Sequence, residues 1–233
     1  MILAIAAAAV AAAAPAPAKC PDVVTPDALI CRALVAQEDG RSDEAAQNFE
    51  EAAKASPDKD PQTARMYAAA GNMWIAAGQA GKAALDLDKA LAMTGLEGEQ
   101  RGEALLDRAR AAEAQSDLAT ARAKLTEARP TISDDPFYWY FSAALAIREG
   151  NAAVAQSSIG EALKLAPSDP TILFEAGHVA HFASNEDAAR NYWTLAAASD
   201  PNGPIGKAAR DALAMLPAPA TVVTEPKPSQ PKS

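Results

Sequence analysis

An alanine pattern that recurs at a nearly constant interval is the feature that most constrains the fold of this chain. Each of five alanines is followed seven residues later by a second alanine. The five pairs are Ala45 and Ala52, Ala83 and Ala90, Ala121 and Ala128, Ala155 and Ala162, and Ala189 and Ala196. The basic period is about 34 residues, and each of the first two intervals contains an insertion of four. A fixed period of this length indicates an array of stacked repeats.

Three further positions keep register with the alanine pairs. Four residues after the first alanine stands a large apolar residue, namely Phe49, Leu87, Leu125, Ile159 and Trp193. Twelve residues before it stands a small one, namely Ala33, Gly71, Ala109, Ala143 and Gly177. Twelve residues after it stands a residue that can end a helix, namely Pro57, Gly95, Ser133, Pro167 and Pro201. Small residues let two helices approach, and a large residue fills the space opposite. Each repeat is therefore predicted to be a helical hairpin.

The turn inside each hairpin is marked by residues that tolerate a left-handed backbone. Glycine stands there in three repeats, and a serine followed by Asp or Asn stands there in the other two. These residues are Gly40, Gly78, Gly150, Ser116 with Asp117, and Ser184 with Asn185. The two insertions fall near residues 58–61 and 96–101, in polar linkers between repeats, where we expect them to lengthen loops.

The combined pattern resembles the tetratricopeptide repeat family, in which a large and a small residue precede A-x₃-F and a closing proline at a 34-residue period. The resemblance runs from Pro26 to about Pro201 and departs from the family where the leucine of the first helix is replaced. The replacing residues are Arg32, Ala70, Arg108, Ser142 and Ala176. The resemblance implies an all-α, right-handed α-solenoid of five hairpins that start near residues 26, 64, 102, 136 and 170. An amphipathic segment at 204–216 is expected to cap the array.

Composition agrees with an all-α fold, because apolar residues make up 49% of the 233-residue chain while aromatic residues make up only 5%. Alanine supplies most of the difference and is the strongest helix former. The net charge of −9 argues against a nucleic-acid partner, which needs clustered Lys and Arg. No phosphate loop, G-x-S-x-G or H-E-x-x-H motif is present, so neither an enzyme nor a cofactor or small-molecule substrate is expected.

The two ends of the chain differ in composition from the repeats. Residues 1–18 lack charge, their apolar run is too short to span a membrane, and Ala16-Pro17-Ala18 fits a small-x-small cleavage pattern. We interpret them as a signal peptide that directs the protein to the periplasm of a bacterium, with no span left after cleavage. Because a basic n-region is missing, a leader on a cytoplasmic protein is the alternative. Residues 19–25 form an N-terminal segment, and the proline-rich residues 217–233 are expected to be a disordered tail.

The only two cysteines, Cys20 and Cys31, follow the proposed cleavage point. In an oxidising compartment they can form a disulfide that ties the mature N-terminus to the first helix. In the alternative, Cys31 packs as a small buried hydrophobic residue and Cys20 stays with the terminus. Neither cysteine has a metal-ligand spacing.

The family resemblance implies a concave groove, formed by the first helices, that binds a peptide or an extended segment of a partner. In the first three repeats the groove positions are Asp27, Ile30, Leu34, Gln37, Glu38, Arg65, Ala68, Asn72, Ile75, Ala76, Glu103, Leu106, Arg110, Glu113 and Ala114. In the last two they are Phe137, Tyr140, Ala144, Ile147, Arg148, Thr171, Phe174, His178, His181 and Phe182. Aromatic residues gather in the second set and are typical anchors of protein interfaces.

The predicted partner-binding residues are Phe137, Tyr140, Ile147, Arg148, Phe174, His178, His181 and Phe182, with Asn72 and Arg110. In the alternative, some of these rings pack against the next repeat or the capping helix. His178 and His181 are one helical turn apart near Glu175, a set too small to predict a metal site. Their imidazoles can make the groove sensitive to pH.

The sequence therefore predicts a non-enzymatic periplasmic scaffold that binds another protein. The alternatives are an envelope adaptor that uses its Pro/Lys tail and a cytoplasmic adaptor of the same family.

Overall fold

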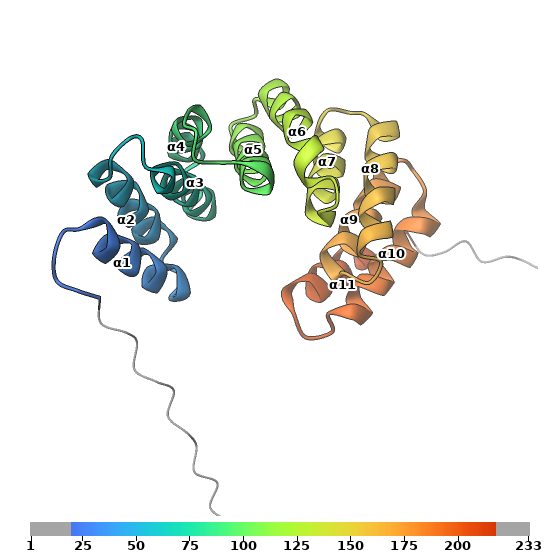
Figure 1. The fold of residues 1–233 in the computed structure, drawn as a ribbon. Helices are drawn as coiled ribbons and strands as arrows, with labels where there is room; N and C mark the ends of the chain where they lie inside the picture. The colour runs from blue at the N-terminus through green and yellow to red at the C-terminus, as the bar shows by residue number, and fades with distance from the viewer. Residues whose placement is uncertain (1–19, 218–233) are drawn as a thin grey trace, which may run out of the picture. The chain divides into compact units, whose positions relative to one another are not determined.

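The computed structural model describes residues 20–217, which contain eleven helices and no strand (Figure 1). The helices are α1 (Pro26–Glu38), α2 (Ser42–Ala55), α3 (Pro61–Ala76), α4 (Ala80–Ala92), α5 (Gly98–Ala114), α6 (Leu118–Ile132), α7 (Pro136–Arg148), α8 (Ala152–Leu165), α9 (Pro170–Phe182), α10 (Glu186–Ser199) and α11 (Pro204–Met215). The predicted signal peptide and residues 218–233 of the predicted tail lie outside the described residues. No helix within the described part is long and apolar enough to cross a membrane.

Helices α1 to α10 pack as five consecutive hairpins, and α11 packs on α9 and α10. The predicted all-α fold of five hairpins with a C-terminal helix is thus confirmed. The helices form two compact bodies, which we call the N-terminal body (α1–α4, to Leu96) and the C-terminal body (α5–α11, from Glu97). The sequence suggested a change of character after the third repeat, whereas the chain divides after the second. The division coincides with the second insertion, near residues 96–101.

The two insertions extend helices more than loops, which corrects the expectation from sequence. Helices α3 and α5 have 16 and 17 residues, whereas α1, α7 and α9 have 13 each. The second and third hairpins accordingly begin at Pro61 and Gly98, earlier than the expected residues 64 and 102. Asp60 explains the earlier start of α3, because its carboxylate accepts a hydrogen bond from the Gln62 amide at 2.9 Å while Pro61 occupies the first turn.

The turns inside the hairpins have the predicted left-handed backbone. The φ values are 73°, 71° and 72° at the three glycines, Gly40, Gly78 and Gly150. The two serines, Ser116 and Ser184, have φ values of 64° and 60°. The Asp and Asn that follow these serines cap α6 and α10, accepting hydrogen bonds from the Thr120 amide at 3.0 Å and the Ala188 amide at 3.1 Å. Asn151, which follows Gly150, caps α8 in the same way and accepts a hydrogen bond from the Val154 amide at 3.1 Å, so such a cap follows both serine and glycine turns.

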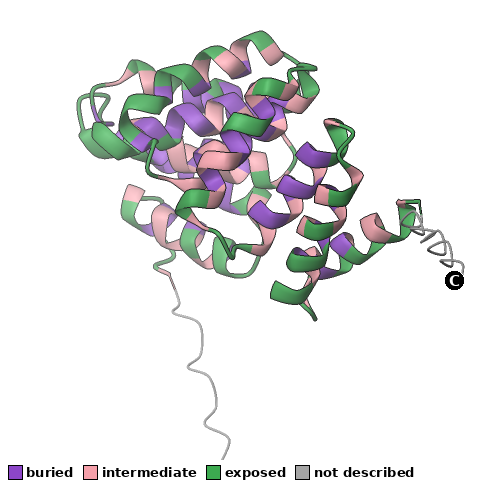
Figure 2. Cartoon of the chain, turned by 90° about the vertical axis from the view of Figure 1, so that its right-hand side faces the viewer, coloured by how far each residue is buried: buried purple, intermediate pink, exposed green. Residues whose placement is uncertain are grey.

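Close packing between the helices of a hairpin depends on the small position of the first helix. A Cβ atom added to Gly71 would lie closer than 3.0 Å to the Leu87 side chain, and one added to Gly177 would lie as close to the Trp193 ring. Both large residues are buried, at 0% and 3% exposed. Figure 2 shows buried segments on helix faces that pack together and exposed ones on outer faces and turns. The predicted pairing of small and large residues is therefore what brings the helices together.

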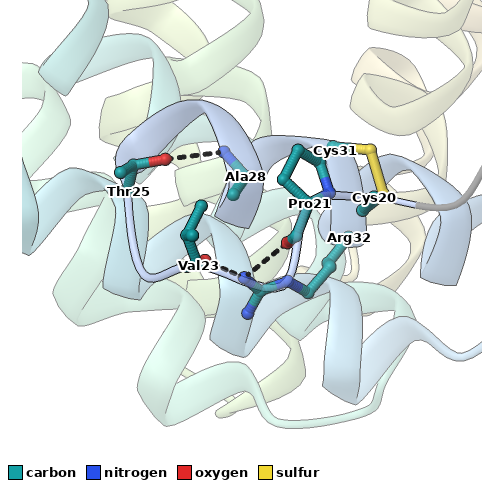
Figure 3. Close-up of a disulfide and its surroundings, with 7 residues drawn as sticks. All are labelled: Cys20, Pro21, Val23, Thr25, Ala28, Cys31 and Arg32. Carbon is teal, nitrogen blue, oxygen red and sulfur yellow. Dashed lines mark hydrogen bonds between the residues drawn. A yellow bond between two sulfur atoms is a disulfide. The ribbon is translucent and has the colours of Figure 1, made fainter.

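A disulfide between Cys20 and Cys31 closes the N-terminus of the N-terminal body onto α1, with the two Cα atoms 5.7 Å apart (Figure 3). This is the first of the two alternatives that the sequence left open. Arg32 supports the same segment, because its guanidinium donates hydrogen bonds to the carbonyl oxygens of Pro21, at 3.3 Å, and Val23. Arg32 stands where the repeat family has leucine, so this departure from the pattern holds residues 21–25 against the first helix.

Ser142 is a second departure with a structural role, in the C-terminal body. Its hydroxyl lies 2.9 Å from the Ser158 hydroxyl of α8 and accepts a hydrogen bond from Arg122 at 3.1 Å. The Arg122 guanidinium also binds the Glu149 carboxylate at 2.6 Å. These bonds join α6 to α7 and satisfy a serine that is only 4% exposed. The first helix of this repeat therefore gains polar contacts where the family packs leucine.

Candidate partner-binding site

A solvent-open cavity of about 550 Å³ lies between α7 and α9 in the C-terminal body. Its lining consists of Ala144, Ile147, Arg148, Glu175, His178, His181 and Phe182. Five of these residues were predicted to bind a partner, and Ala144 was among the predicted groove positions. The structure thus brings the carboxyl-terminal parts of the two predicted helix faces together around one cavity.

The cavity exists because α7 and α9 lie side by side and present matching faces (Figure 1). Ala144, Ile147 and Arg148 are spaced three and four residues apart, so they share one face of α7. Glu175, His178 and Phe182 repeat this spacing on α9. Beneath the two faces lies a core cluster of small and branched residues from α7, α8 and α9. The core members are Ala143, Ala146, Ala155, Ile159, Ala162, Ile172, Ala176 and Val179.

Arg148 forms one edge of the cavity and is tied to the end of α5. Its guanidinium donates to the backbone oxygen of Glu113 at 3.1 Å and also pairs with the Glu113 carboxylate. The positive charge of Arg148 is therefore already compensated within the C-terminal body, although its side chain is 43% exposed.

Glu175 is the lining residue that sequence reasoning did not include in the site. The residue is 8% exposed, and one carboxylate oxygen lies 3.4 Å from Nδ1 of His178, one turn along the same helix. A charged residue this well buried is unusual in proteins. The available signal was its position in the sequence ILFEAGHVAHF, where it is the only carboxylate among mostly apolar neighbours.

The rings of His178 and His181 pack against the ring of Trp193 in α10. The His178 and His181 rings lie 5.5 Å and 5.9 Å from the Trp193 ring, measured between centroids. Trp193 is held in place by the hydrogen bond from its Nε1 to the Phe174 backbone oxygen at 3.0 Å. His181 also contacts the Glu186 carboxylate, at 3.0 Å and 3.1 Å. The sequence identified Trp193 as a packing residue and did not indicate that it supports both histidines.

Four of the predicted residues on the C-terminal body do not line the cavity, and three of them lie together. Phe137 stacks on Tyr140 with ring centroids 5.2 Å apart, and the Arg110 guanidinium lies 5.6 Å from the Phe137 ring. Burial raises the pKa of Tyr140, and the neighbouring Glu175 carboxylate raises it further. These three residues form a second aromatic group on the C-terminal body, with Phe137 38% exposed.

Phe174, the fourth, follows the packing alternative, because it lies against the core cluster that α9 and α10 share with α11. Its ring also contacts the His178 ring edge-on, with centroids 4.4 Å apart. Asn72 lies on α3 of the N-terminal body and is not among the residues that line this cavity.

The described residues provide few side chains arranged to bind a metal ion. No group of three side chains able to hold a metal ion occurs within residues 20–217. Nδ1 of His178 contacts the Glu175 carboxylate and Nδ1 of His181 contacts the Glu186 carboxylate, so the two histidines do not share a carboxylate. The arrangement therefore offers apolar and aromatic contact, one nearly buried carboxylate and one compensated arginine.

Comparison with solved structures identifies the fold. A thermophilic tetratricopeptide repeat protein from Thermus thermophilus superposes with a TM-score of 0.67 at 17% identity, covering 82% of this chain and 100% of that chain. PilW, described as a widely conserved type IV pilus biogenesis factor, gives 0.66 at 19% identity and covers 78% and 81% of the two chains. YrrB, described as a tetratricopeptide repeat protein with an unusual peptide-binding site, gives 0.56 at 18% identity and covers 79% and 91%.

The sequence itself matches no family model and no curated protein. At identities this low, structural similarity establishes the fold alone. The coverage nevertheless extends over most of both chains, and the repeat positions keep their register through all five hairpins. The chain thus has the fold of the tetratricopeptide repeat proteins.

Proposed function

We propose that this protein is a non-enzymatic scaffold that binds a peptide or an extended segment of another protein in the cavity between α7 and α9. The observation that carries the proposal is the cavity itself, which gathers five predicted partner-binding residues on one open surface. Its volume of about 550 Å³ lies within the range of ligand-binding clefts. Phe182, 38% exposed at its edge, is the kind of aromatic side chain that anchors a protein interface.

The lining of the cavity also supports a role in binding rather than in catalysis. It contains no hydroxyl or thiol side chain that could serve as a nucleophile. Glu175 and the two histidines are hydrogen-bonding groups, but each histidine Nδ1 is directed to a carboxylate of its own body. YrrB, the protein described above as having an unusual peptide-binding site, shares this fold, which is consistent with peptide binding by this chain.

Export to the periplasm is the second part of the proposal. It is supported by the uncharged, apolar residues 1–18 and by the disulfide between Cys20 and Cys31, a bond that persists in oxidising compartments. Fractionation of cells that produce the full chain tests it. The mature protein should appear in the periplasmic fraction with residues 1–18 removed and both cysteines resistant to alkylation. A full-length, alkylatable protein in the cytoplasm would contradict export.

Site-specific photo-crosslinking in cells tests partner binding. A photoreactive phenylalanine analogue replaces Phe182 at the cavity and, as the control, Leu195 on α10, which is similarly exposed at 44%. We expect adducts with a partner protein from position 182, and their loss when Ile147→Glu places a charge in the cavity. Equal adducts from position 195, or adducts at 182 that persist with Ile147→Glu, would contradict binding in the cavity.

Removal of residues 218–233 tests whether the partner binds to the cavity or to the tail. If the cavity binds the partner, adducts from position 182 should persist in the shortened chain. Their loss would instead favour the envelope adaptor that uses its Pro/Lys tail.

A further inference from the structure

Glu175 places a negative charge in the wall of a mostly apolar cavity, and the surrounding residues do little to compensate it. The residue is 8% exposed, and its hydrogen-bond partner in the described part of the chain is Nδ1 of His178, at 3.4 Å. This distance is near the outer limit for a hydrogen bond. A buried carboxylate without a close cation is costly, because the interior solvates charge poorly. The cavity wall is therefore short of a positive charge next to Glu175.

The cationic side chains near the cavity are bound to other carboxylates. Arg148 lines the cavity but pairs with Glu113 of α5. Arg110 pairs with Asp107 at 2.7 Å and lies over the Phe137 ring. His181 contacts the carboxylate of Glu186 at 3.0 Å. Each of these groups is already matched, and the contact of His178 with Glu175, at 3.4 Å, is longer than that of His181 with Glu186, at 3.0 Å. Glu175 is therefore the carboxylate at the cavity that is most open to a cation from outside.

The remaining lining suits the stem of a long basic side chain. Ala144, Ile147 and Phe182 supply apolar surface along which methylene groups can lie while the charged head reaches a carboxylate. The Phe182 ring can also face the cation directly. The whole chain carries a net charge of −9, which attracts a basic segment over a longer range.

We propose that the cavity between α7 and α9 selects a lysine or arginine side chain of the bound partner segment, with its cationic head at the Glu175 carboxylate. This inference rests on the proposed function and specifies what the site recognises. The stem of the basic residue packs between Ile147 and Phe182. Apolar residues on either side of it extend the contact along the open part of the cavity.

Binding of defined peptides to the full chain tests the proposal. The probes are fluorescein-labelled peptides of the sequence Gly-Ser-Ala-Leu-Xaa-Leu-Ala-Ser-Gly, in which Xaa is arginine, lysine, citrulline or glutamate. Citrulline keeps the shape of arginine and removes its charge. Fluorescence polarisation should show the arginine peptide binding about tenfold or more tightly than the citrulline peptide, as a charge-assisted hydrogen bond requires.

The variant Glu175→Gln keeps the size of the side chain and removes its charge. It should weaken the arginine peptide to the level of the citrulline peptide and leave the citrulline peptide unchanged. Glu161→Gln makes the same change on the outer surface of α8, where Glu161 pairs with Lys164, and should leave the preference for arginine intact.

Several outcomes would overturn the proposal. Equal affinity for arginine and citrulline, an equal loss of both in Glu175→Gln, tighter binding of the glutamate peptide, or no binding of the arginine peptide would each do so. Crosslinking from position 182 distinguishes a cavity that binds a partner without preference for a basic side chain from a cavity that binds no partner. If adducts form in cells but the crosslinked partner segment lacks a basic residue, the cavity binds a partner without this selectivity. If no adducts form, the proposed function itself fails.

Discussion

Two tryptophans, one in each body, are both buried but contact different kinds of side chain. Trp74 of α3 and Trp193 of α10 are both buried, at 1% and 3% exposed. Trp74 donates its Nε1 hydrogen bond to the Asp86 carboxylate at 3.2 Å, and the Lys82 ammonium lies 4.1 Å from the ring centroid. Trp193 donates to a backbone oxygen instead and supports His178 and His181, which line an open cavity.

The difference lies in what covers the ring. In the N-terminal body, lysines of the body itself lie over aromatic rings, since Lys89 also approaches the Tyr67 ring at 4.8 Å. In the C-terminal body Arg110 and Arg129 lie over the Phe137 and Trp139 rings, but the layer on Trp193 consists of imidazole rings that line the cavity. Surface available to a partner therefore occurs where the side chains that cover a buried tryptophan also line an open cavity. Four changes test how far the two bodies differ.

Reduction of the disulfide should give the largest effect and confine it to the N-terminal body. A bond that closes a loop with a sequence separation of 11 stabilises the folded state by about 3 kcal/mol in the chain-entropy model. Hydrogen exchange measured by mass spectrometry should show faster exchange in α1 and α2 on reduction, with α7 to α10 unchanged. A double variant, Cys20→Ser with Cys31→Ser, should already exchange fast and not respond to the reductant. Faster exchange in α9 would show that the bodies do not behave separately.

Gly177→Ala should destabilise the C-terminal body by about 2 kcal/mol, because the added methyl group meets the rigid Trp193 ring and overpacks the hairpin. Gly71→Ala is the matched change in the N-terminal body. There the methyl group meets the Leu87 side chain, which can adjust by rotation about its single bonds, whereas the indole of Trp193 is a rigid ring. The higher helix propensity of alanine, about 1 kcal/mol, offsets part of the cost in both variants. Urea unfolding followed by circular dichroism should show the larger loss for Gly177→Ala. A larger loss for Gly71→Ala would contradict the difference between the two packing sites.

Lys82→Ala tests whether the lysine covers Trp74. Loss of the cation from the ring face should cost about 0.5 kcal/mol, which is typical of an exposed cation–π pair. It should also make Trp74 more accessible to acrylamide quenching, measured in a background where Trp139 and Trp193 are phenylalanine. Lys59→Ala, on the same body in the linker before α3, serves as the control. Unchanged quenching in Lys82→Ala would mean that the ring is covered by other groups.

Asp86 should make the smallest contribution, through the pH dependence of stability. Burial raises the pKa of Asp86 in the folded state, although the bond from Lys89 partly opposes this shift. The folded chain therefore holds the proton more tightly than the unfolded chain, and the resulting stability is present below the unfolded pKa and lost as pH rises through the raised value. The pKa of Lys89 is itself raised by this bond, so the lysine stays charged over this range.

The measurement compares the chain with Asp86→Asn, which keeps an acceptor for Trp74 but cannot ionise. The free energy of unfolding of the native chain, relative to the variant, should decrease as pH rises from the unfolded aspartate pKa of about 4 through the raised pKa of the folded state. Parallel pH profiles for the two proteins would show that the burial of Asp86 does not affect its ionisation.

The repeat pattern was sufficient to predict the hairpins, because small and large residues at fixed spacing determine which helix faces meet. It placed the two insertions in loops, whereas the structure places most of each in α3 and α5. An insertion of four is close to one helical turn of about 3.6 residues. An insertion of that length therefore extends a helix while keeping its buried face in register, and the sequence pattern does not distinguish this from a longer loop.

The candidate site was predictable in part for a related reason. Helical spacing identified Ile147, Arg148, His178, His181 and Phe182, because residues three or four apart share a face. It could not determine where the Tyr140 and Phe174 rings point, which depends on neighbouring helices rather than on spacing. Glu175 was omitted because it is not one of the groove positions that the family resemblance implies, and only the contact between α7 and α9 makes it part of a cavity wall.

The sequence of helix α11 limits how further repeats could be added to this array. Pro136, Pro170 and Pro204 follow one another at the repeat period of about 34 residues, so α11 occupies the place of the first helix in a sixth repeat. Its seventh residue after the proline is Asp211, where Ala143 and Gly177 stand in the preceding repeats. Asp211 is 67% exposed and pairs with Lys207. Duplication of a hairpin beyond α11 would bury this carboxylate, so a change of Asp211 to a small residue would have to come before any lengthening of the array.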